Sequence, residues 1–308
     1  ETGDRRGDTG TPQAIAFSRW KGSGGQIMQR FRFGLVVSQR DPWPELVERA
    51  QLAESLGADI IWVVDHFIGP DDDLQMTFEG WTVLAGLAMA TSRVRLGMLV
   101  SGNTYRNPGL LAKQAVTVDH ISNGRVDFGI GAGWWEKEHE MYGYDFPSAG
   151  ERVSRLQEAL EMIDSLQRNE RTTFEGEYYG LQDATFEPKP LQHPSMPIVL
   201  GADGPRMLRI TARYASIWNT RSEPADAARK SQFLDDACRE IERDPGEITR
   251  SIWPFPDFLT SVDDFRAMVD AYREIGFTDF VSRWPVDDDQ MAVLHEVASE
   301  VLPAYRAG

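Results

Sequence analysis

The stretch GRVDFGIGAGWWEKEHEMYG, residues 124–143, is compatible with two folds. Gly129, Gly131 and Gly133 could form a dinucleotide-binding turn, but that fingerprint needs a third glycine where this chain has Trp134, and a helix that starts within the motif. In a barrel of parallel strands, the same glycines fall at the carboxyl end of the fourth strand, where missing side chains let a ligand approach the backbone. Tight-turn packing is the alternative reason for them. The organisation of the whole chain decides between the two folds.

Strand-like and helical segments alternate from residue 31 onward. The predicted strands cover residues 31–37, 58–66, 93–100, 125–131, 197–202, 215–220, 248–254 and 277–283. The predicted helices cover residues 42–57, 78–91, 107–124, 150–167, 204–214, 223–242 and 261–275, and another helix closes the chain. Eight such units in about 250 residues predict an α/β protein with a closed (β/α)8 TIM barrel. The first strand-to-helix turn has no glycine, which argues against a doubly wound dinucleotide fold.

Two segments fall outside this alternation. Residues 1–30 show no hydrophobic period, so we expect a disordered leader or a segment added for expression. Residues 31–308 are then a single barrel domain. Residues 171–196 are rich in glycine, proline and aromatic residues, which predicts a hairpin or lid inserted between the fourth helix and the fifth strand. The run PDDD, residues 70–73, is expected to be an exposed loop.

The composition limits the partners of the protein. The chain has 308 residues and a net charge of −16, which argues against binding to nucleic acid or to anionic membranes. No apolar run approaches the ~20 residues that a membrane span needs, and no segment is typical of a signal peptide. Because Cys238 is the only cysteine, no intrachain disulfide can form, which favours a location in the reducing cytoplasm.

Residues 97–147, GMLVSGNTYRNPGLLAKQAVTVDHISNGRVDFGIGAGWWEKEHEMYGYDFP, strongly resemble the bacterial-luciferase-like flavin superfamily. The closest resemblance is to its oxidoreductases that use the deazaflavin coenzyme F420. The resemblance continues through GADIIWVVDHF, GERVSRLQEALEMI, FEGEYYGLQDATFEPKP and PIVLGADGPRMLRITARYASIWN, and so covers about residues 31–220. Beyond residue 220, only the alternation of strands and helices supports it.

This resemblance implies an enzyme that transfers a hydride between coenzyme F420 and a small organic substrate, and a homodimer. An FMN-dependent monooxygenase of the same superfamily is the alternative. A third interpretation is a barrel that has lost activity and serves as a binding or dimerisation module. The presence of Asp65, His66 and Gly102 argues against it.

The resemblance also implies where the site lies. A bulge with a non-prolyl cis peptide within residues 99–102 would press on the cofactor ring. Asp65 and His66 would face the reactive edge of the ring as catalytic residues, and imidazole titrates near neutrality, as a proton carrier must. The turn GADGPR, residues 201–206, would hold the cofactor phosphate on helix N–H groups, unless it is an ordinary β/α turn. The predicted cofactor contacts are Val100, Ser101, Gly102, Thr104, Gly131, Ala132, Gly133, Trp134, Gly201, Ala202, Gly204 and Arg206.

Other polar residues are interpreted more simply. His139 stands among carboxylates in EKEHE, residues 136–140, but no second histidine or cysteine lies at metal-ligand spacing, so we expect no metal and a solvated or capping cluster. Cys238 has no sequence context for nucleophilic catalysis, and no G-x-S-x-G motif indicates acyl transfer. Asn219, at the end of the sixth predicted strand, is a weaker pocket candidate.

Overall fold

The computed structural model describes residues 20–21, 27–28, 30–254 and 259–307. Most of the segment 1–30, predicted to be a disordered leader, therefore lies outside the described residues. Within it, β1 (Trp20–Lys21) pairs antiparallel with β2 (Ile27–Met28). No helix of the described part is long and apolar enough to cross a membrane.

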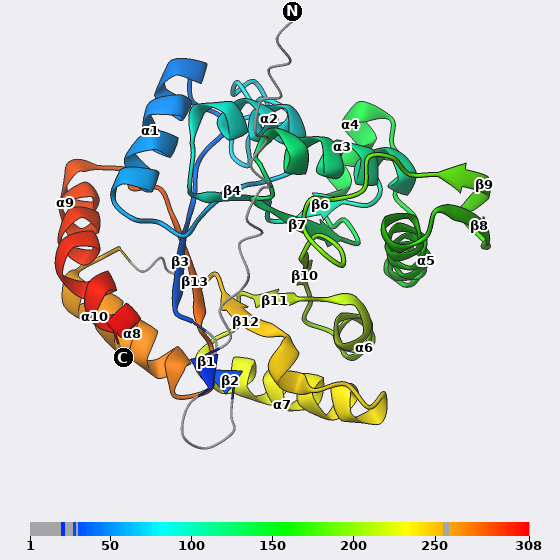
Figure 1. Ribbon diagram of the computed structural model, residues 1–308. Coiled ribbons are helices and arrows are strands. Elements are labelled where there is room, and N and C mark those ends of the chain that lie inside the picture. The colour runs from blue at the N-terminus through cyan, green and yellow to red at the C-terminus, as the bar shows by residue number, and fades with distance from the viewer. Residues whose placement is uncertain (1–19, 22–26, 29, 255–258, 308) are drawn as a thin grey trace, which may run out of the picture.

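Eight parallel strands close into a barrel, which confirms the predicted TIM barrel (Figure 1). They are β3 (Arg32–Val36), β4 (Ile60–Val63), β5 (Arg95–Met98), β7 (Val126–Gly131), β10 (Ile198–Gly201), β11 (Ile217–Thr220), β12 (Thr249–Ile252) and β13 (Asp279–Arg283). The pairing of β13 with β3 and of β7 with β10 completes the ring.

The helices follow the strands in the predicted order. They are α1 (Trp43–Ser55), α2 (Gly80–Ala90), α3 (Pro108–Ile121), α5 (Ala149–Arg168), α6 (Pro205–Tyr214), α7 (Pro224–Glu240), α8 (Val262–Arg273), α9 (Asp288–Glu296) and α10 (Leu302–Ala307). A 3-10 turn, Pro245–Glu247, precedes β12, and a π-helical turn, Val297–Val301, joins α9 to α10. An additional short helix, α4 (Glu136–Tyr142), follows β7.

The predicted insertion is an antiparallel hairpin of β8 (Arg171–Glu175) and β9 (Gly180–Thr185) between α5 and β10. The carboxylate of Glu158 on α5 accepts hydrogen bonds from the backbone N–H groups of residues 177–179. These bonds hold the hairpin turn against α5. The loop at residues 70–73 is exposed, as predicted.

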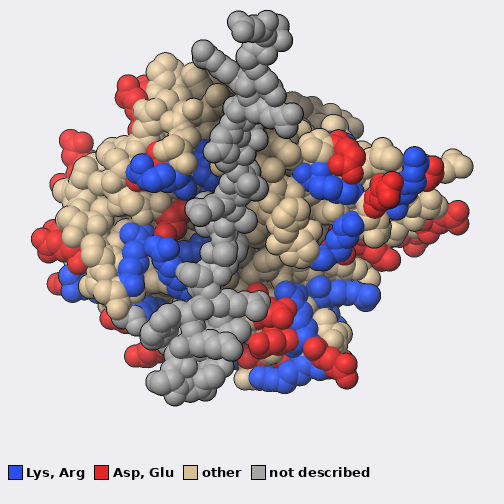
Figure 2. Space-filling model, in the orientation of Figure 1, with Lys and Arg blue, Asp and Glu red and all other residues tan. Residues whose placement is uncertain are grey.

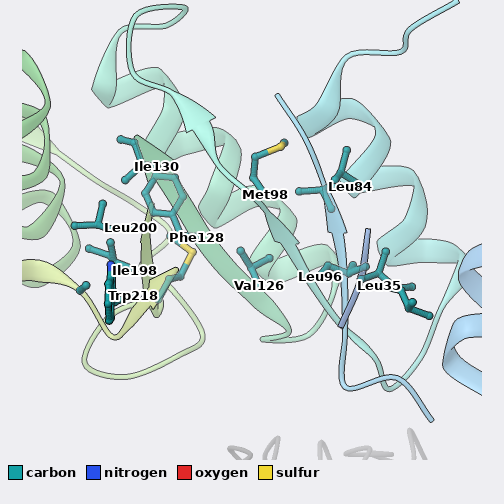
Figure 3. Close-up of a cluster of buried hydrophobic side chains, with 14 of the residues drawn as sticks. Leu35, Leu84, Leu96, Met98, Val126, Phe128, Ile130, Ile198, Leu200 and Trp218 are labelled. Carbon is teal, nitrogen blue, oxygen red and sulfur yellow. The ribbon is translucent and has the colours of Figure 1, made fainter. Parts of the chain in front are cut away.

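Two apolar layers stabilise the barrel. The larger lies between the sheet and the helices, where side chains such as Leu96, Phe128 and Leu200 project from the strands (Figure 3). The smaller fills the barrel interior around Trp62, which is fully buried. Trp62 fits because the neighbouring strands carry glycines: a Cβ atom would lie 2.7 Å from Trp62 Nε1 at Gly34 and 2.2 Å from its ring at Gly97.

Charged residues form a buried layer near the amino ends of the strands. Asp127 accepts hydrogen bonds from Arg32 at 2.7 Å and from Arg95 at 2.8 Å. Asp279 is equally buried, but within the described residues neither of its oxygens has a hydrogen bond of good geometry: Arg32 Nε is 4.0 Å away, and Ser251 interacts only weakly. Burial, which outweighs the attraction of Arg32, raises the pKa of Asp279 to about 6.

Asp279→Asn is expected to change how stability depends on pH. Because the folded pKa lies above the unfolded value, the stability that protonated Asp279 contributes is complete below about pH 4 and is lost as the pH rises through about 6. The free energy of unfolding, measured in urea, should therefore rise in the variant relative to wild type. This gain should be about 2 kcal/mol larger at pH 7.5 than at pH 4.5. Asp145→Asn, at an exposed position, serves as the control. If the free energies of unfolding of the variant and wild type differ by the same amount at both pH values, the raised pKa of Asp279 is contradicted.

Candidate active site

The third strand is interrupted by a bulge at the mouth of the barrel. β5 pairs with β7 up to Gly97 opposite Asp127, and β6 (Ser101–Gly102) resumes the pairing with Ser101 opposite Ile130. Three residues, 98–100, therefore oppose two on β7. The peptide bond between Leu99 and Val100 is cis, which confirms the predicted bulge and assigns its cis bond.

The glycines that follow make room for this bulge. A Cβ atom at Gly129 would lie 1.7 Å from the carbonyl oxygen of Met98, and one at Gly131 would lie 2.8 Å from Val100 Cγ2. Gly133 has a φ of +79°, a backbone angle that residues with a side chain rarely adopt. At least Gly129 is thus required by backbone packing. On β10, the strand paired with β7, a Cβ atom at Gly201 would be 3.7 Å from the same Val100 side chain. Val100 and the two glycines, which carry no side chain, therefore form an apolar floor.

Asp65 connects the loop after β4 to the bulge. Its side chain is buried, accepts hydrogen bonds from Arg106 at 2.6 and 2.8 Å and from the N–H of Gly102 at 2.9 Å. Arg106 also bonds to Glu79, the N-cap of α2. With both oxygens occupied, Asp65 is placed to position the bulge rather than to touch a substrate.

His66 lies beside this floor with one ring nitrogen engaged. Its Nδ1 is 2.9 Å from Glu138 Oε2, whereas its Nε2 has no hydrogen-bond partner within the described part of the chain. The rings of Trp134 and Trp135 pack edge-on against the imidazole, with centroids 5.7 and 5.1 Å away. Because Nδ1 donates to a carboxylate, Nε2 is available to exchange a proton.

Glu138, on α4, is the functional residue that the sequence analysis missed. It is fully buried and accepts hydrogen bonds from His66, from Tyr105 Oη at 2.6 Å, and from the backbone N–H groups of Phe67 and Ile68. Burial alone would raise the pKa of Glu138, but the bonds from His66 and Tyr105 hold it below its usual range. Glu138 is therefore an anion that fixes His66.

The interpretation of residues 136–140 as a solvated or capping cluster is wrong for Glu138 and His139, which are both fully buried. His139 Nδ1 donates to the carbonyl oxygen of Trp135 at 2.7 Å, so its Nε2 accepts from Thr104 Oγ1 at 2.6 Å. α4 turns these two side chains inward while its other charged residues stay in solvent. No cluster of three or more histidine, cysteine or acidic residues suited to a metal occurs among the described residues.

The turn at residues 201–206 leaves the amino end of α6 open. Its N-cap, Gly204, supplies no side-chain hydrogen bond, and a Cβ atom there would meet nothing within 4 Å. Arg206 donates to the carbonyl of Gly150 at 3.0 Å and to Ser154 Oγ at 2.8 Å, both on α5. Unsatisfied helix N–H groups beside an arginine form a cradle that suits an anion.

Other residues considered in the sequence analysis are hydrogen-bonded or buried within the protein. Ser101 Oγ accepts a hydrogen bond from Trp81 Nε1 at 3.1 Å, so its side chain faces α2. The amide of Asn219 donates to Ser251 Oγ at 2.9 Å. Ala202 bonds through its backbone to residues 218 and 219 on β11. Cys238 is buried in α7, and burial raises the pKa of its thiol, as expected of a structural cysteine.

Trp134→Ala is expected to weaken substrate binding more than it lowers the melting temperature. The indole of Trp134 is 69% exposed and stacks on Trp135 next to His66, so it borders the site instead of filling the core. Replacing a buried tryptophan by alanine lowers the free energy of unfolding by about 3–5 kcal/mol, and replacing Trp134 should lower it far less. Steady-state kinetics and thermal unfolding compare the two effects. A large loss of stability with unchanged KM would contradict this role.

Comparisons with known proteins agree with this architecture. The chain matches the family described as luciferase-like monooxygenase over residues 24–296, and it therefore belongs to that family. It is 34% identical over 250 residues to the phthiodiolone/phenolphthiodiolone dimycocerosates ketoreductase of Mycobacterium tuberculosis, which covers 72% of this chain and 64% of the relative.

Among solved structures, the coenzyme F420-dependent tetrahydromethanopterin reductase from Methanopyrus kandleri is similar with a TM-score of 0.77 and 19% identity, over 90% of this chain and 99% of that one. A monooxygenase from Streptomyces bottropensis is similar with a TM-score of 0.74 and 19% identity, over 89% and 99%. Both similarities show the fold of the chain.

Proposed function

We propose that this protein is an oxidoreductase that transfers a hydride between coenzyme F420 and an organic substrate at the mouth of the barrel. The observation that carries the proposal is His66, which is fixed by Glu138 at Nδ1 and has no partner at Nε2 beside the bulge. This pair supplies a proton carrier next to a flat floor that suits a planar ring. The F420-dependent neighbour in structure supports the choice of cofactor.

The residues of the site fit such a cofactor. The floor of Val100, Gly131 and Gly201 leaves room for a ring against the backbone, and the amino end of α6 with Arg206 would hold its phosphate. When bound, coenzyme F420 would give or accept the hydride at its ring. Reduction of a carbonyl then requires one proton on oxygen, which the imidazolium form of His66 would donate from Nε2 while its other proton stays on Nδ1 against Glu138; oxidation of the alcohol would return the proton to Nε2. The ketoreductase relative supports a carbonyl–alcohol pair.

An FMN-dependent monooxygenase is the second candidate. The description of the family and the structural neighbour from Streptomyces bottropensis support it. The same floor and the same cradle at α6 would accept FMN. A homodimer in the cytoplasm, with a small organic substrate, stays a prediction from the sequence.

Titration of the purified protein with each cofactor tests the proposal. We expect saturable binding of coenzyme F420, followed by absorbance, and weaker binding of FMN. Gly201→Val fills the floor and Arg206→Glu reverses the charge beside α6, so each should weaken F420 binding by about tenfold or more while the fold is retained. Gly246→Val, exposed in the 3-10 turn before β12, is the control for substitution of a glycine. Tighter binding of FMN would favour the second candidate, and wild-type affinity in both variants would place the phosphate elsewhere.

A further inference from the structure

Gln39 is a buried polar residue that the proposed function does not use. It lies in the loop after β3, three residues beyond the end of that strand, and its side chain is 1% exposed. Its Nε2 atom donates to the carbonyl oxygen of Val64 at 2.8 Å and to that of His66 at 3.1 Å. These two carbonyls flank Asp65, so one amide group holds the backbone of the loop after β4 on both sides of that residue.

The peptide unit between His66 and Phe67 is held at both of its ends. Its carbonyl oxygen accepts from Gln39, and its N–H group donates to Oε1 of Glu138. The C=O and N–H groups of a trans peptide, such as this one, point in opposite directions, so the two side chains hold the unit from opposite sides. The second oxygen of Glu138 bonds to the imidazole of the same histidine. Gln39 and Glu138 together therefore fix both the backbone and the ring of His66.

These contacts determine the orientation of the Gln39 amide. Nε2 carries two hydrogens, one for each carbonyl oxygen, and the reverse orientation would set Oε1 against both of these oxygens. In the observed orientation, Oε1 is buried and has no hydrogen-bond partner within the described part of the chain. An unpaired buried acceptor destabilises a fold, and this chain keeps one together with the two bonds to the loop. We take this as a sign that the position of the loop matters for activity.

The loop that Gln39 holds is also packed against α2. The carbonyl oxygen of Gln39 accepts from the N–H group of Phe78 at 3.0 Å, in the segment before α2. A Cβ atom at Gly80, the first residue of α2, would lie 2.9 Å from the carbonyl oxygen of Val64. Glycine at this position leaves room for the carbonyl that Gln39 bonds. The carbonyl of Val64 is therefore in close contact with α2 as well as with the amide.

A neutral amide suits this place better than a charged group. Charged side chains of both signs are spread over the surface of the molecule (Figure 2), and two buried carboxylates, Asp65 and Glu138, already hold this loop. A third carboxylate at position 39 would face two carbonyl oxygens with no hydrogen to donate. A cationic group would donate, but its charge would disfavour the imidazolium form of His66. Glutamine supplies both donors without changing the charge beside the imidazole.

We propose that Gln39 is a positioning residue of the active site, which acts through the backbone of His66 to hold the imidazole where it exchanges its proton. This inference rests on the proposed function, which makes His66 the proton carrier. Loss of the two bonds would let residues 64–67 move. A displacement of about 1 Å in a reacting group can slow a reaction on the order of 10²-fold, so a loss of this kind reaches the chemistry without any contact between Gln39 and the substrate.

Gln39→Met tests this role, because methionine has nearly the same length and no donor. The hydride-transfer rate should fall by about tenfold to 10²-fold while the Kd of the cofactor stays close to wild type. Gln39→Asn keeps the amide on a shorter side chain that cannot reach both carbonyls, so its rate should lie between those of Gln39→Met and wild type.

Gln167→Met, on α5, is the matched control. Gln167 is also buried, accepts from the N–H group of Met196 at 3.0 Å, and leaves its Nε2 without a partner among the described residues. This variant loses a buried glutamine amide that bonds to backbone, as Gln39→Met does, but it has no contact with the loop after β4. Its melting temperature should fall to a similar extent, and its hydride-transfer rate should stay at the wild-type value.

Two further measurements need no cofactor. The N–H groups of Phe67 and Ile68, which bond to Glu138, should exchange with solvent about tenfold faster in Gln39→Met than in wild type, and at the wild-type rate in Gln167→Met. The imidazole 15N shifts of His66 should change in Gln39→Met, because a displaced ring no longer keeps its bond to Glu138. If Gln39→Met fails to fold, the same measurements on Gln39→Asn decide.

Slower hydride transfer together with faster exchange and changed 15N shifts supports the inference. A wild-type rate in Gln39→Met overturns it, and so does a lower rate with unchanged exchange and shifts. An equal loss of rate in Gln167→Met would show that reduced stability alone slows the reaction, and would overturn it as well. If wild-type protein neither binds nor reduces F420, the proposed function fails, and the exchange and the 15N shifts still decide whether Gln39 orients His66.

Discussion

His66→Ala is expected to slow hydride transfer by ~10²–10⁴-fold while the Kd of the cofactor changes little. General acid–base catalysis contributes about this much, and His66 Nδ1 is bonded to Glu138 while its Nε2 has no hydrogen-bond partner in the described part of the chain. Single-turnover absorbance of the cofactor measures the rate, and equilibrium titration measures the Kd.

His66→Asn separates proton transfer from positioning. Asparagine can still bond to Glu138, but it cannot carry a proton near pH 7, so this variant should be nearly as slow as His66→Ala. His295→Ala, on α9 and far along the chain from the site, controls for the loss of an imidazole. Wild-type turnover in His66→Asn would show that His66 only positions its neighbours and that the proton comes from another group.

The alternation of strands and helices was sufficient to predict the barrel, because a parallel sheet buried on both faces leaves long apolar runs. The predicted ends of the elements were less accurate. Residues 58–66, which contain five consecutive apolar residues, were predicted to form one strand, but the strand ends at Val63. Val64 continues the apolar pattern because it packs on the cluster inside the barrel, and Asp65 and His66 follow as loop residues. Hydrophobicity reports burial, and it does not report where backbone pairing stops.

The sequence could predict only part of the site. The bulge and the pair at residues 65–66 were accessible through a family resemblance, since they lie in one short motif each. Glu138 was not, because EKEHE is dense in charge and only the short helix α4 determines which of its residues turn inward.

Glu138→Gln is expected to lower the rate of hydride transfer on the order of 10²-fold and to destabilise the fold by about 3 kcal/mol. The buried carboxylate accepts from four donors, two backbone N–H groups on one oxygen and the side chains of His66 and Tyr105 on the other. An amide of the same size must turn its NH2 group toward one of these pairs. Either the loop after β4 loses its anchor, or His66 loses the acceptor that keeps its proton on Nδ1.

Three measurements on this variant distinguish positioning from general stability. The hydride-transfer rate should fall while the Kd of the cofactor stays close to wild type, and imidazole 15N shifts should show that His66 no longer holds its proton mainly on Nδ1. Glu140→Gln, exposed on the same helix, should change none of the three. If Glu138→Gln is destabilised but keeps both the wild-type tautomer and the wild-type rate, Glu138 only anchors the loop, and His66 must be oriented by its packing against Trp134 and Trp135.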